Sequence, residues 1–231
     1  MFPIIDIRSN VIGFGGRILT KDKGAKYLNT SDTLVFNKSR NLFALNFAKE
    51  SKQDKIILAE GYMDVIALHQ AGFTNSVATL GTALTTEQAR LISAYTDNII
   101  ISYDSDGAGK KASMRATGIF SEIGIKTSVI NMEGAKDPDE YIKKFGAKRF
   151  ESIINKSKSV LEFEIDRIYE KYNLQIPEEK MKFLNEFCFL MSSVRNPIER
   201  DVYIGKISTD PDPTKQAINE RVESMLKIQC N

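Results

Sequence analysis

Five acidic side chains fall into three short groups, and each group comes after an apolar run of the sequence. The groups are Glu60, the pair Asp104 and Asp106, and the pair Asp137 and Asp139. Carboxylates gathered at one place repel one another, by about 4 kcal/mol for each pair at roughly 4 Å near a protein surface. A divalent cation relieves this repulsion, and ligands that are all carboxylate oxygens favour Mg²⁺ or Mn²⁺ over zinc. If the five side chains converge, they therefore offer the chemistry of a magnesium or manganese centre.

The elements that must position these acids alternate between strand and helix. The sequence predicts strands at residues 56–59, 76–80, 98–103 and 126–132, and helices at 62–70, 85–95 and 107–124. Apolar strands that alternate with helices are typical of a parallel sheet buried on both faces. The carboxyl ends of such strands meet at one edge, where the loops form a ligand crevice. We therefore expect an α/β layer with all three acidic groups at the same edge of its sheet.

Each acidic group also has a simpler explanation. An aspartate after a strand is often only the N-cap of the next helix, and Asp106 with the following glycine is compatible with a plain turn. Asp104 and Asp106 do not open a calcium loop, because Ala108 and Arg115 stand at its fifth and twelfth positions. The nearby glycines do not form a P-loop, because Lys111 stands where Ser or Thr is required. The predicted metal centre therefore depends on the three groups taken together.

Further elements flank the α/β layer on both sides. Residues 2–7 and 11–19 predict a β-hairpin and residues 40–50 a helix. After residue 137 the sequence predicts only helices, at 139–145, 148–155, 160–172, 178–192, 197–207 and 214–228. We divide the chain into an N-terminal α+β subdomain at residues 1–50, an α/β domain at 51–146 and a helical bundle at 147–231. Because the chain enters a strand directly at Phe2, we expect a fragment of a longer protein.

Basic residues are concentrated in one part of a nearly neutral chain. The chain carries 32 Lys and Arg against 30 Asp and Glu, a net charge of +2, which does not support a generally basic nucleic-acid surface. Residues 17–40 contain six basic residues and two acidic ones, namely Arg17, Lys21, Lys23, Lys26, Lys38 and Arg40 against Asp22 and Asp32. This is either solvated loop charge or a local phosphate-binding surface.

The scarcity of histidine and cysteine argues against several kinds of site. His69 is the only histidine, and Cys188 and Cys230 are far apart, without a C-x-x-C partner. Histidine metal clusters, a structural zinc and a disulfide framework are therefore not expected, and a reducing cytoplasm fits best. No apolar stretch reaches 18 residues and no signal peptide precedes the first strand, so we expect a cytoplasmic protein without a membrane partner.

Several segments resemble the motifs of one enzyme family. The acidic groups lie in Glu60-Gly61-Tyr62-Met63-Asp64, in Tyr103-Asp104-Ser105-Asp106 with Ala108-Gly109, and in Asp137-Pro138-Asp139. Together these resemble the Toprim motifs of bacterial replicative primases of the DnaG type. Upstream, the segments that resemble the basic subdomain of that family are Phe2-Pro3-Ile4, Gly13-Phe14-Gly15-Gly16-Arg17 and Lys26-Tyr27-Leu28-Asn29. The resemblance is close over residues 1–155 and loose over the helical tail.

The resemblance implies a Toprim-like sheet and a role for each group of residues. The acids that would hold the catalytic metals are Glu60, Asp104, Asp106, Asp137 and Asp139, and the first three of these would also be catalytic. Glu60 would be the candidate general base, and Asp64 is a further motif acid. The residues that would bind incoming nucleotide phosphates and the template strand are Arg17, Lys26, Asn29, Lys38 and Arg40.

The implied activity is synthesis of short RNA primers from nucleoside triphosphates on a single-stranded DNA template, with Mg²⁺ or Mn²⁺. The zinc-binding module of the family and the front of its basic subdomain are expected to be absent from this chain, and so is the domain that docks on the replicative helicase. Two alternatives stay open. One is a Toprim nuclease that cuts DNA, and the other is a truncated module that binds nucleotide, metal or single-stranded DNA with little turnover.

Overall fold

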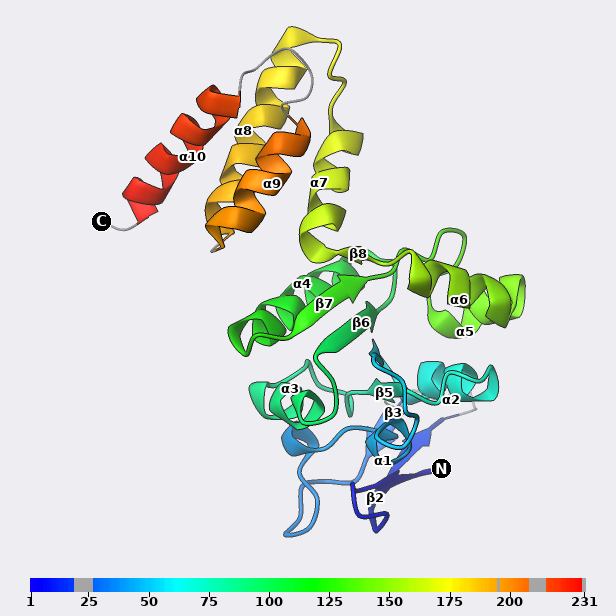
Figure 1. The fold of residues 1–231 in the computed structure, drawn as a ribbon. Helices are drawn as coiled ribbons and strands as arrows, with labels where there is room; N and C mark the ends of the chain where they lie inside the picture. Colours follow the sequence, from blue (N-terminus) through cyan, green and yellow to red (C-terminus); the bar gives the residue numbers. More distant parts are fainter. Residues whose placement is uncertain (19–26, 195, 208–214, 230–231) are drawn as a thin grey trace. The chain divides into compact units, whose positions relative to one another are not determined.

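The structure, a computed structural model, describes residues 1–18, 27–194, 196–207 and 215–229. The chain divides into two compact units, Met1–Val160 and Leu161–Asn231. The first unit contains two sheets with helices around them, and the second is helical (Figure 1). This confirms the predicted α/β fold with an α+β part before it and helices after it. The finer division at residues 50 and 146 stays a prediction.

A five-stranded sheet lies in the middle of the first unit. In the order in which they pair, its strands are β5 (Ser76–Ala78), β4 (Ile56–Ala59), β6 (Asn98–Ser102), β7 (Lys126–Val129) and β8 (Lys158–Ser159). The first four are parallel, and β8 pairs antiparallel with β7. The four predicted parallel strands are confirmed, whereas β8 was not predicted, because two polar residues carry no strand pattern.

Helices cover both faces of this sheet (Figure 1). On one face lie α3 (Thr86–Ser93) and α4 (Gly107–Glu122), and on the other lie α2 (Tyr62–Gln70), α5 (Pro138–Phe145) and α6 (Ala147–Asn155). The strand β4 illustrates the alternation, because Leu58 packs in the same core as Phe120 of α4 and Ile57 packs in the same core as Phe150 of α6. All four residues of β4 are buried, as expected for a parallel strand between two helical layers.

The N-terminal residues form a separate antiparallel sheet in the order β1 (Phe2–Ile5), β2 (Val11–Arg17) and β3 (Tyr27–Asn29), which confirms the predicted hairpin. The helix predicted at residues 40–50 is wrong in extent, because the 3₁₀ turn η1 (Lys38–Arg40) and the short helix α1 (Leu45–Ala48) take its place. Between them, Phe43 N donates to Ala78 O (2.9 Å) and Ala78 N donates to Phe43 O (3.3 Å). Pairing with the edge strand β5 thus outweighs the local preference for helix.

The second unit consists of α7 (Val160–Lys171), α8 (Pro177–Ser193), α9 (Pro197–Ile207) and α10 (Lys215–Gln229). Its core includes Phe183, Phe187 and Met191 of α8, Ile204 of α9 and Val222 of α10. The helical pattern predicted for this part of the sequence is confirmed. Within the described ranges of the chain, no helix is both long enough and apolar enough to cross a membrane.

Candidate active site

A cavity of about 860 Å³ opens at the carboxyl edge of the five-stranded sheet. Four of the five predicted carboxylates line it, namely Glu60, Asp104, Asp137 and Asp139. Glu60 directly follows β4, Asp104 follows β6, and the other two stand at the start of α5, beyond β7. Because Ala59 and Ser102 are partners in the ladder, the chain leaves β4 and β6 at the same level. The sheet topology therefore brings acids from distant parts of the sequence to one cavity.

Asp106, the fifth predicted carboxylate, is not among the residues that line this cavity. Its Oδ1 accepts hydrogen bonds from the backbone N–H groups of Ala108 (2.9 Å) and Gly109 (2.7 Å) and caps α4. Asp137 is also a cap, since its Oδ1 accepts from Glu140 N (2.8 Å) at the start of α5, but it does line the cavity. The positive end of a helix stabilises negative charge at both places. The simpler N-cap explanation is therefore correct for these two residues, whatever else they do.

Asp64 lies in the first turn of α2 and also lines the cavity. Its carboxylate accepts a hydrogen bond from Gly61 N (3.2 Å). Burial, together with the negative charges of Asp137 and Asp104, raises the pKa of this carboxyl to about 7. The sequence identified Asp64 only as a further motif acid, because its burial depends on how α2 packs against the sheet.

Asp104 is half-buried and surrounded by other acids. Burial raises the pKa of its carboxyl to about 6, with contributions from the negative charges of Glu60, Asp137 and Asp106, whereas Lys136 acts in the opposite direction. At both carboxyl groups, burial and the neighbouring acids therefore outweigh the hydrogen bonds and positive charges that would lower the pKa. Such a cluster is a functional-site candidate on physical grounds.

Two lysines at the rim of the cavity were not singled out from the sequence. Lys143 Nζ lies 2.6 Å from Asp139 Oδ2, and Lys136 Nζ lies 3.7 Å from Asp137 Oδ2. They alternate with the acids between residues 133 and 143, which is the signal that could have identified them. The lysine of each pair is largely exposed, at 74% for Lys136 and 71% for Lys143, so neither ion pair is expected to contribute much to stability.

The donor set fits a hard divalent cation, because the acids around the cavity offer only carboxylate oxygens. Over the residues that the structure describes, no three His, Cys, Asp or Glu side chains are close enough to hold a metal ion as they stand. The two ion pairs and the two helix caps occupy some of the carboxylates. A metal ion held by all of these acids would therefore require side-chain movements, including that of Asp139 away from Lys143.

The predicted nucleotide-binding residues have different positions. Arg17 of β2 lines the cavity and lies over the ring of Tyr27, with 5.7 Å between the guanidinium carbon and the ring centre. Asn29 does not line it but donates from Nδ2 to Leu80 O (2.7 Å), which ties β3 to the loop after β5. Lys38 and Arg40, both in η1, do not line the cavity either. Lys26, like Lys21 and Lys23, lies outside the described residues.

Two glycines permit close packing around the site. A Cβ on Gly109 would lie 2.1 Å from the backbone oxygen of Asp104, so α4 can begin against Asp104 only without a side chain there. A Cβ on Gly15 would lie 2.8 Å from the ring of Tyr62. Tyr62 is buried against the N-terminal sheet, and burial raises the pKa of its hydroxyl to about 12. These contacts hold the N-terminal sheet beside the cavity.

Three family models match the chain. A family described as Toprim-like matches residues 57–142, and the N-terminal domain of the DNA primase catalytic core matches residues 1–49. The DnaB-helicase binding domain of primase matches residues 161–209. The expectation that the helicase-docking part is missing from this chain is therefore wrong. The helices within residues 161–209 have mixed charge and no catalytic motif, so the sequence pattern alone did not indicate a helicase-binding domain.

Known proteins resemble the chain over most of its length. It is 41% identical over 232 residues to a DNA primase of Clostridium acetobutylicum, which covers 100% of this chain and 39% of that protein. A DNA primase domain from Pseudomonas aeruginosa is 30% identical, with a TM-score of 0.75, over 96% of this chain and 71% of that one. A DnaG primase catalytic domain solved bound to ssDNA is 32% identical, with a TM-score of 0.73, over 90% of this chain and 67% of that one. The chain spans 37–39% of the length of the first curated relatives it matches. From these matches, the chain belongs to the family of bacterial DnaG-type DNA primases.

Proposed function

We propose that this chain carries the catalytic centre for synthesis of short RNA primers on a single-stranded DNA template. The observation that carries the proposal is one cavity that combines a cluster of acids at the carboxyl edge with Arg17 and Tyr27 of the N-terminal sheet. The acids suit a hard cation, and a guanidinium beside an aromatic ring suits the phosphate and the base of a nucleotide. A related catalytic domain was solved bound to ssDNA, which supports single-stranded DNA as the template.

The acids of the cavity are assigned to Mg²⁺ or Mn²⁺ and to proton transfer. Glu60, Asp64 and Asp104 supply oxygens from the ends of β4 and β6 and from the first turn of α2, and Asp137 and Asp139 complete the set once the lysines release them. We also assign Asp106 to the metals, through Oδ2, because its Oδ1 caps α4. When bound, divalent cations stabilise the charge that develops on the attacking 3′-oxygen and on the leaving pyrophosphate. Glu60 is exposed at the cavity, so it can accept the proton of the 3′-hydroxyl.

The cationic residues are assigned to phosphate. Arg17, Arg115, Lys136 and Lys143 line the cavity and can contact the triphosphate of an incoming nucleotide. Lys26, Lys38 and Arg40 extend the same role to the template strand, while Asn29 positions the loop that follows β5. Because exposed lysines and arginines act on phosphate through long-range charge, affinity for the template should fall steeply as salt is added.

The second unit is proposed to contact the replicative helicase. The family match at residues 161–209 supports this partner. Met181 and Phe189 of α8 are two turns apart and are 60% and 65% exposed, and Ile198 of α9 is 77% exposed. Exposed apolar side chains of this kind favour a protein contact. As a replication enzyme with this partner, the protein is assigned to the cytoplasm.

The activity is tested by incubating the chain with single-stranded DNA, labelled nucleoside triphosphates and Mg²⁺ or Mn²⁺. Because relatives are longer, extension of an annealed RNA oligonucleotide is measured beside initiation, and we expect extension to exceed initiation. Asp104→Asn and Glu60→Gln should lose incorporation while retaining the fold. Full incorporation by Asp104→Asn would refute the proposal. Cleavage of the template without nucleotides would favour the nuclease alternative, and binding of nucleotide without incorporation would favour the truncated binding module.

A further inference from the structure

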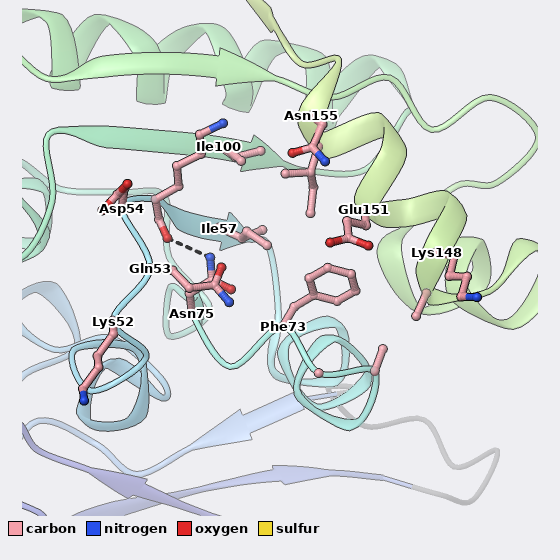
Figure 2. A pocket seen from close by; sticks show the side chains of 15 residues that line it. Lys52, Gln53, Asp54, Ile57, Phe73, Asn75, Ile100, Lys148, Glu151 and Asn155 are labelled. Atoms are coloured by element: carbon pink, nitrogen blue, oxygen red, sulfur yellow. Dashed lines mark hydrogen bonds between the residues drawn. The ribbon is translucent and has the colours of Figure 1, made fainter.

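A second cavity, of about 520 Å³, lies at the opposite edge of the five-stranded sheet (Figure 2). Its walls come from residues 52–55 before β4, from residues 71–75 between α2 and β5, and from one face of α6. None of its lining residues is shared with the cavity of the acids. Nothing in the proposed primer synthesis uses this cavity.

The middle of the cavity is apolar. Ile57 of β4 and Ile100 of β6 are buried in the sheet, and Ile154 is buried on α6. Phe73 is held edge-on against Phe150, with 5.1 Å between the ring centres. Figure 2 shows the ring of Phe73 between the sheet and α6, with Glu151 and Asn155 reaching in its direction from the helix. This surface suits a flat ring rather than a fully hydrated ion.

Asn75 provides an unmet hydrogen-bond acceptor at the same place. The residue is 2% exposed, and its Nδ2 donates to Lys55 O at 2.7 Å. Because a backbone carbonyl can only accept, this bond fixes the orientation of the amide. Its Oδ1 is buried and has no hydrogen-bond partner. A buried polar atom without a partner is costly, so a ligand that donates an N–H or O–H group would be favoured here.

The outer part of the cavity is charged and more basic than acidic. Lys52, Lys55 and Lys148 line it together with Asp54 and Glu151. Within the part of the chain that the structure describes, none of these five side chains forms an ion pair. The lysines are therefore available to an anionic group, and Figure 2 shows Lys52 and Lys148 on opposite sides of the cavity.

We propose that this cavity binds a nucleoside phosphate. The base lies against Phe73 and the isoleucines, its ring donors meet Asn75 and the exposed amides of Gln53 and Asn155, and the phosphate lies beside Lys55 or Lys148. A simple anion would leave the apolar surface and Asn75 unused, and an apolar ligand would leave the lysines unused. The volume lies within the ordinary range for small-molecule sites, about 300–1,000 Å³. The proposal does not depend on primer synthesis.

Calorimetric titration of the whole chain tests it, with EDTA present so that divalent metal does not assist binding at the other edge. The probes are ADP, GDP, adenosine and inorganic pyrophosphate. We expect saturable binding of at least one of the two nucleotides, with adenosine and pyrophosphate at least tenfold weaker. Absence of saturable nucleotide binding would overturn the proposal. So would pyrophosphate or adenosine binding as tightly as the nucleotide, because the site would then recognise only one half of the ligand.

Variants locate the binding. The double change Lys55→Glu and Lys148→Glu alters exposed residues and should weaken nucleotide binding at least tenfold, and Ala147→Phe should fill the cavity and abolish it. Lys156→Glu is the matched control, because Lys156 is exposed just beyond α6 but does not line the cavity. Arg17→Glu changes the other edge. Lys156→Glu should bind within twofold of the unchanged protein. Because Arg17 is a proposed phosphate contact of the other cavity, a loss in Arg17→Glu equal to that of the double variant would place the nucleotide at the carboxyl edge and overturn the proposal.

Discussion

The carboxyl and amino edges of the five-stranded sheet differ in how strongly their charged side chains are buried and repel one another. At the carboxyl edge, burial and mutual repulsion raise the pKa of Asp64 to about 7 and that of Asp104 to about 6. At the amino edge, Lys55, Lys148 and Glu151 are all exposed to solvent. The same strands end at both edges, so the difference arises in the loops. The carboxyl edge carries an electrostatic cost that a cation would remove, whereas the amino edge has almost none, which is why the chemistry is assigned to the former.

The largest effect is expected from removing one charge at the carboxyl edge. Asp104→Asn should lower primer extension about 1,000-fold or more, since a lost metal ligand removes several kcal/mol of transition-state stabilisation. Its melting temperature should stay within a few degrees or rise, because a repelling charge has been removed. Extension rates and thermal melting measure the two effects.

The control for Asp104 lies at the other end of the same strand. Asp97 is exposed and directly precedes β6, and it lines neither cavity. Asp97→Asn makes the same chemical change and should leave extension unaltered. Equal losses in both variants would show that the effect comes from net charge and not from the edge.

The second effect concerns the glycine that lets α4 start against Asp104. In Gly109→Ala the new Cβ would lie 2.1 Å from Asp104 O, so the helix or the acid must move. We expect a loss of about 3 kcal/mol in the free energy of unfolding and roughly a 100-fold loss of extension, since displacements near 1 Å can cost that much. Gly107→Ala, two residues earlier, meets no atom within 4 Å and should be close to neutral. Denaturant unfolding and extension assays of the two variants test this contrast. Unchanged stability and unchanged extension in Gly109→Ala would contradict it.

The third effect is a dependence of stability on pH in the metal-free protein. The pKa of Asp64 is about 7 in the folded chain against an ordinary 3.8, so the folded state binds this proton more tightly. The contribution of Asp64 to stability is therefore present below about pH 4 and is lost as the pH rises to about 7. Asp64→Asn should raise the free energy of unfolding at pH 8 by at most about 4 kcal/mol, the equivalent of that pKa difference. The amide oxygen of the new side chain can still accept from Gly61 N, but a neutral acceptor makes a weaker hydrogen bond than a carboxylate, which will reduce the gain.

Urea unfolding from pH 4 to pH 8 in EDTA measures this. The unchanged protein should lose stability across that range relative to Asp64→Asn, and parallel curves would contradict the assignment. Adding Mg²⁺ or Mn²⁺ should then stabilise the unchanged protein, by about 2.7 kcal/mol at 100 times its dissociation constant. The same addition should do little for Asp104→Asn.

The sequence predicted those parts of the site that depend on topology. Apolar runs at 56–59 and 98–103 identified two parallel strands, and their ends placed Glu60 and Asp104 at one edge. It could not predict what depends on packing. The burial of Asp64 needs α2 in place, whereas the lysine partners of Asp137 and Asp139 are local in sequence and could have been identified.

Long-range contacts account for the errors in the fold. The pairing of Phe43 with Ala78 replaces the helix predicted at 40–50, and no local pattern indicates a partner 35 residues away. The strand β8 exists because Ser159 lies opposite Ser128, not because its own residues favour it. The cavity at the amino edge has a similar origin, since its lining comes from three separate segments without a motif.

The smallest effect concerns the counterions at the rim of the acidic cavity. Lys143 pairs with Asp139 at 2.6 Å, but its side chain is 71% exposed. Lys143→Ala should change the free energy of unfolding by no more than about 0.5 kcal/mol, as for other exposed pairs. If Lys143 contacts nucleotide phosphate, the KM for nucleotide should rise roughly threefold, the equivalent of one exposed ionic contact. Lys126→Ala, at the exposed amino end of β7, should leave KM unchanged. Equal KM values in both lysine variants would remove Lys143 from the phosphate site and leave it as a counterion of Asp139 alone.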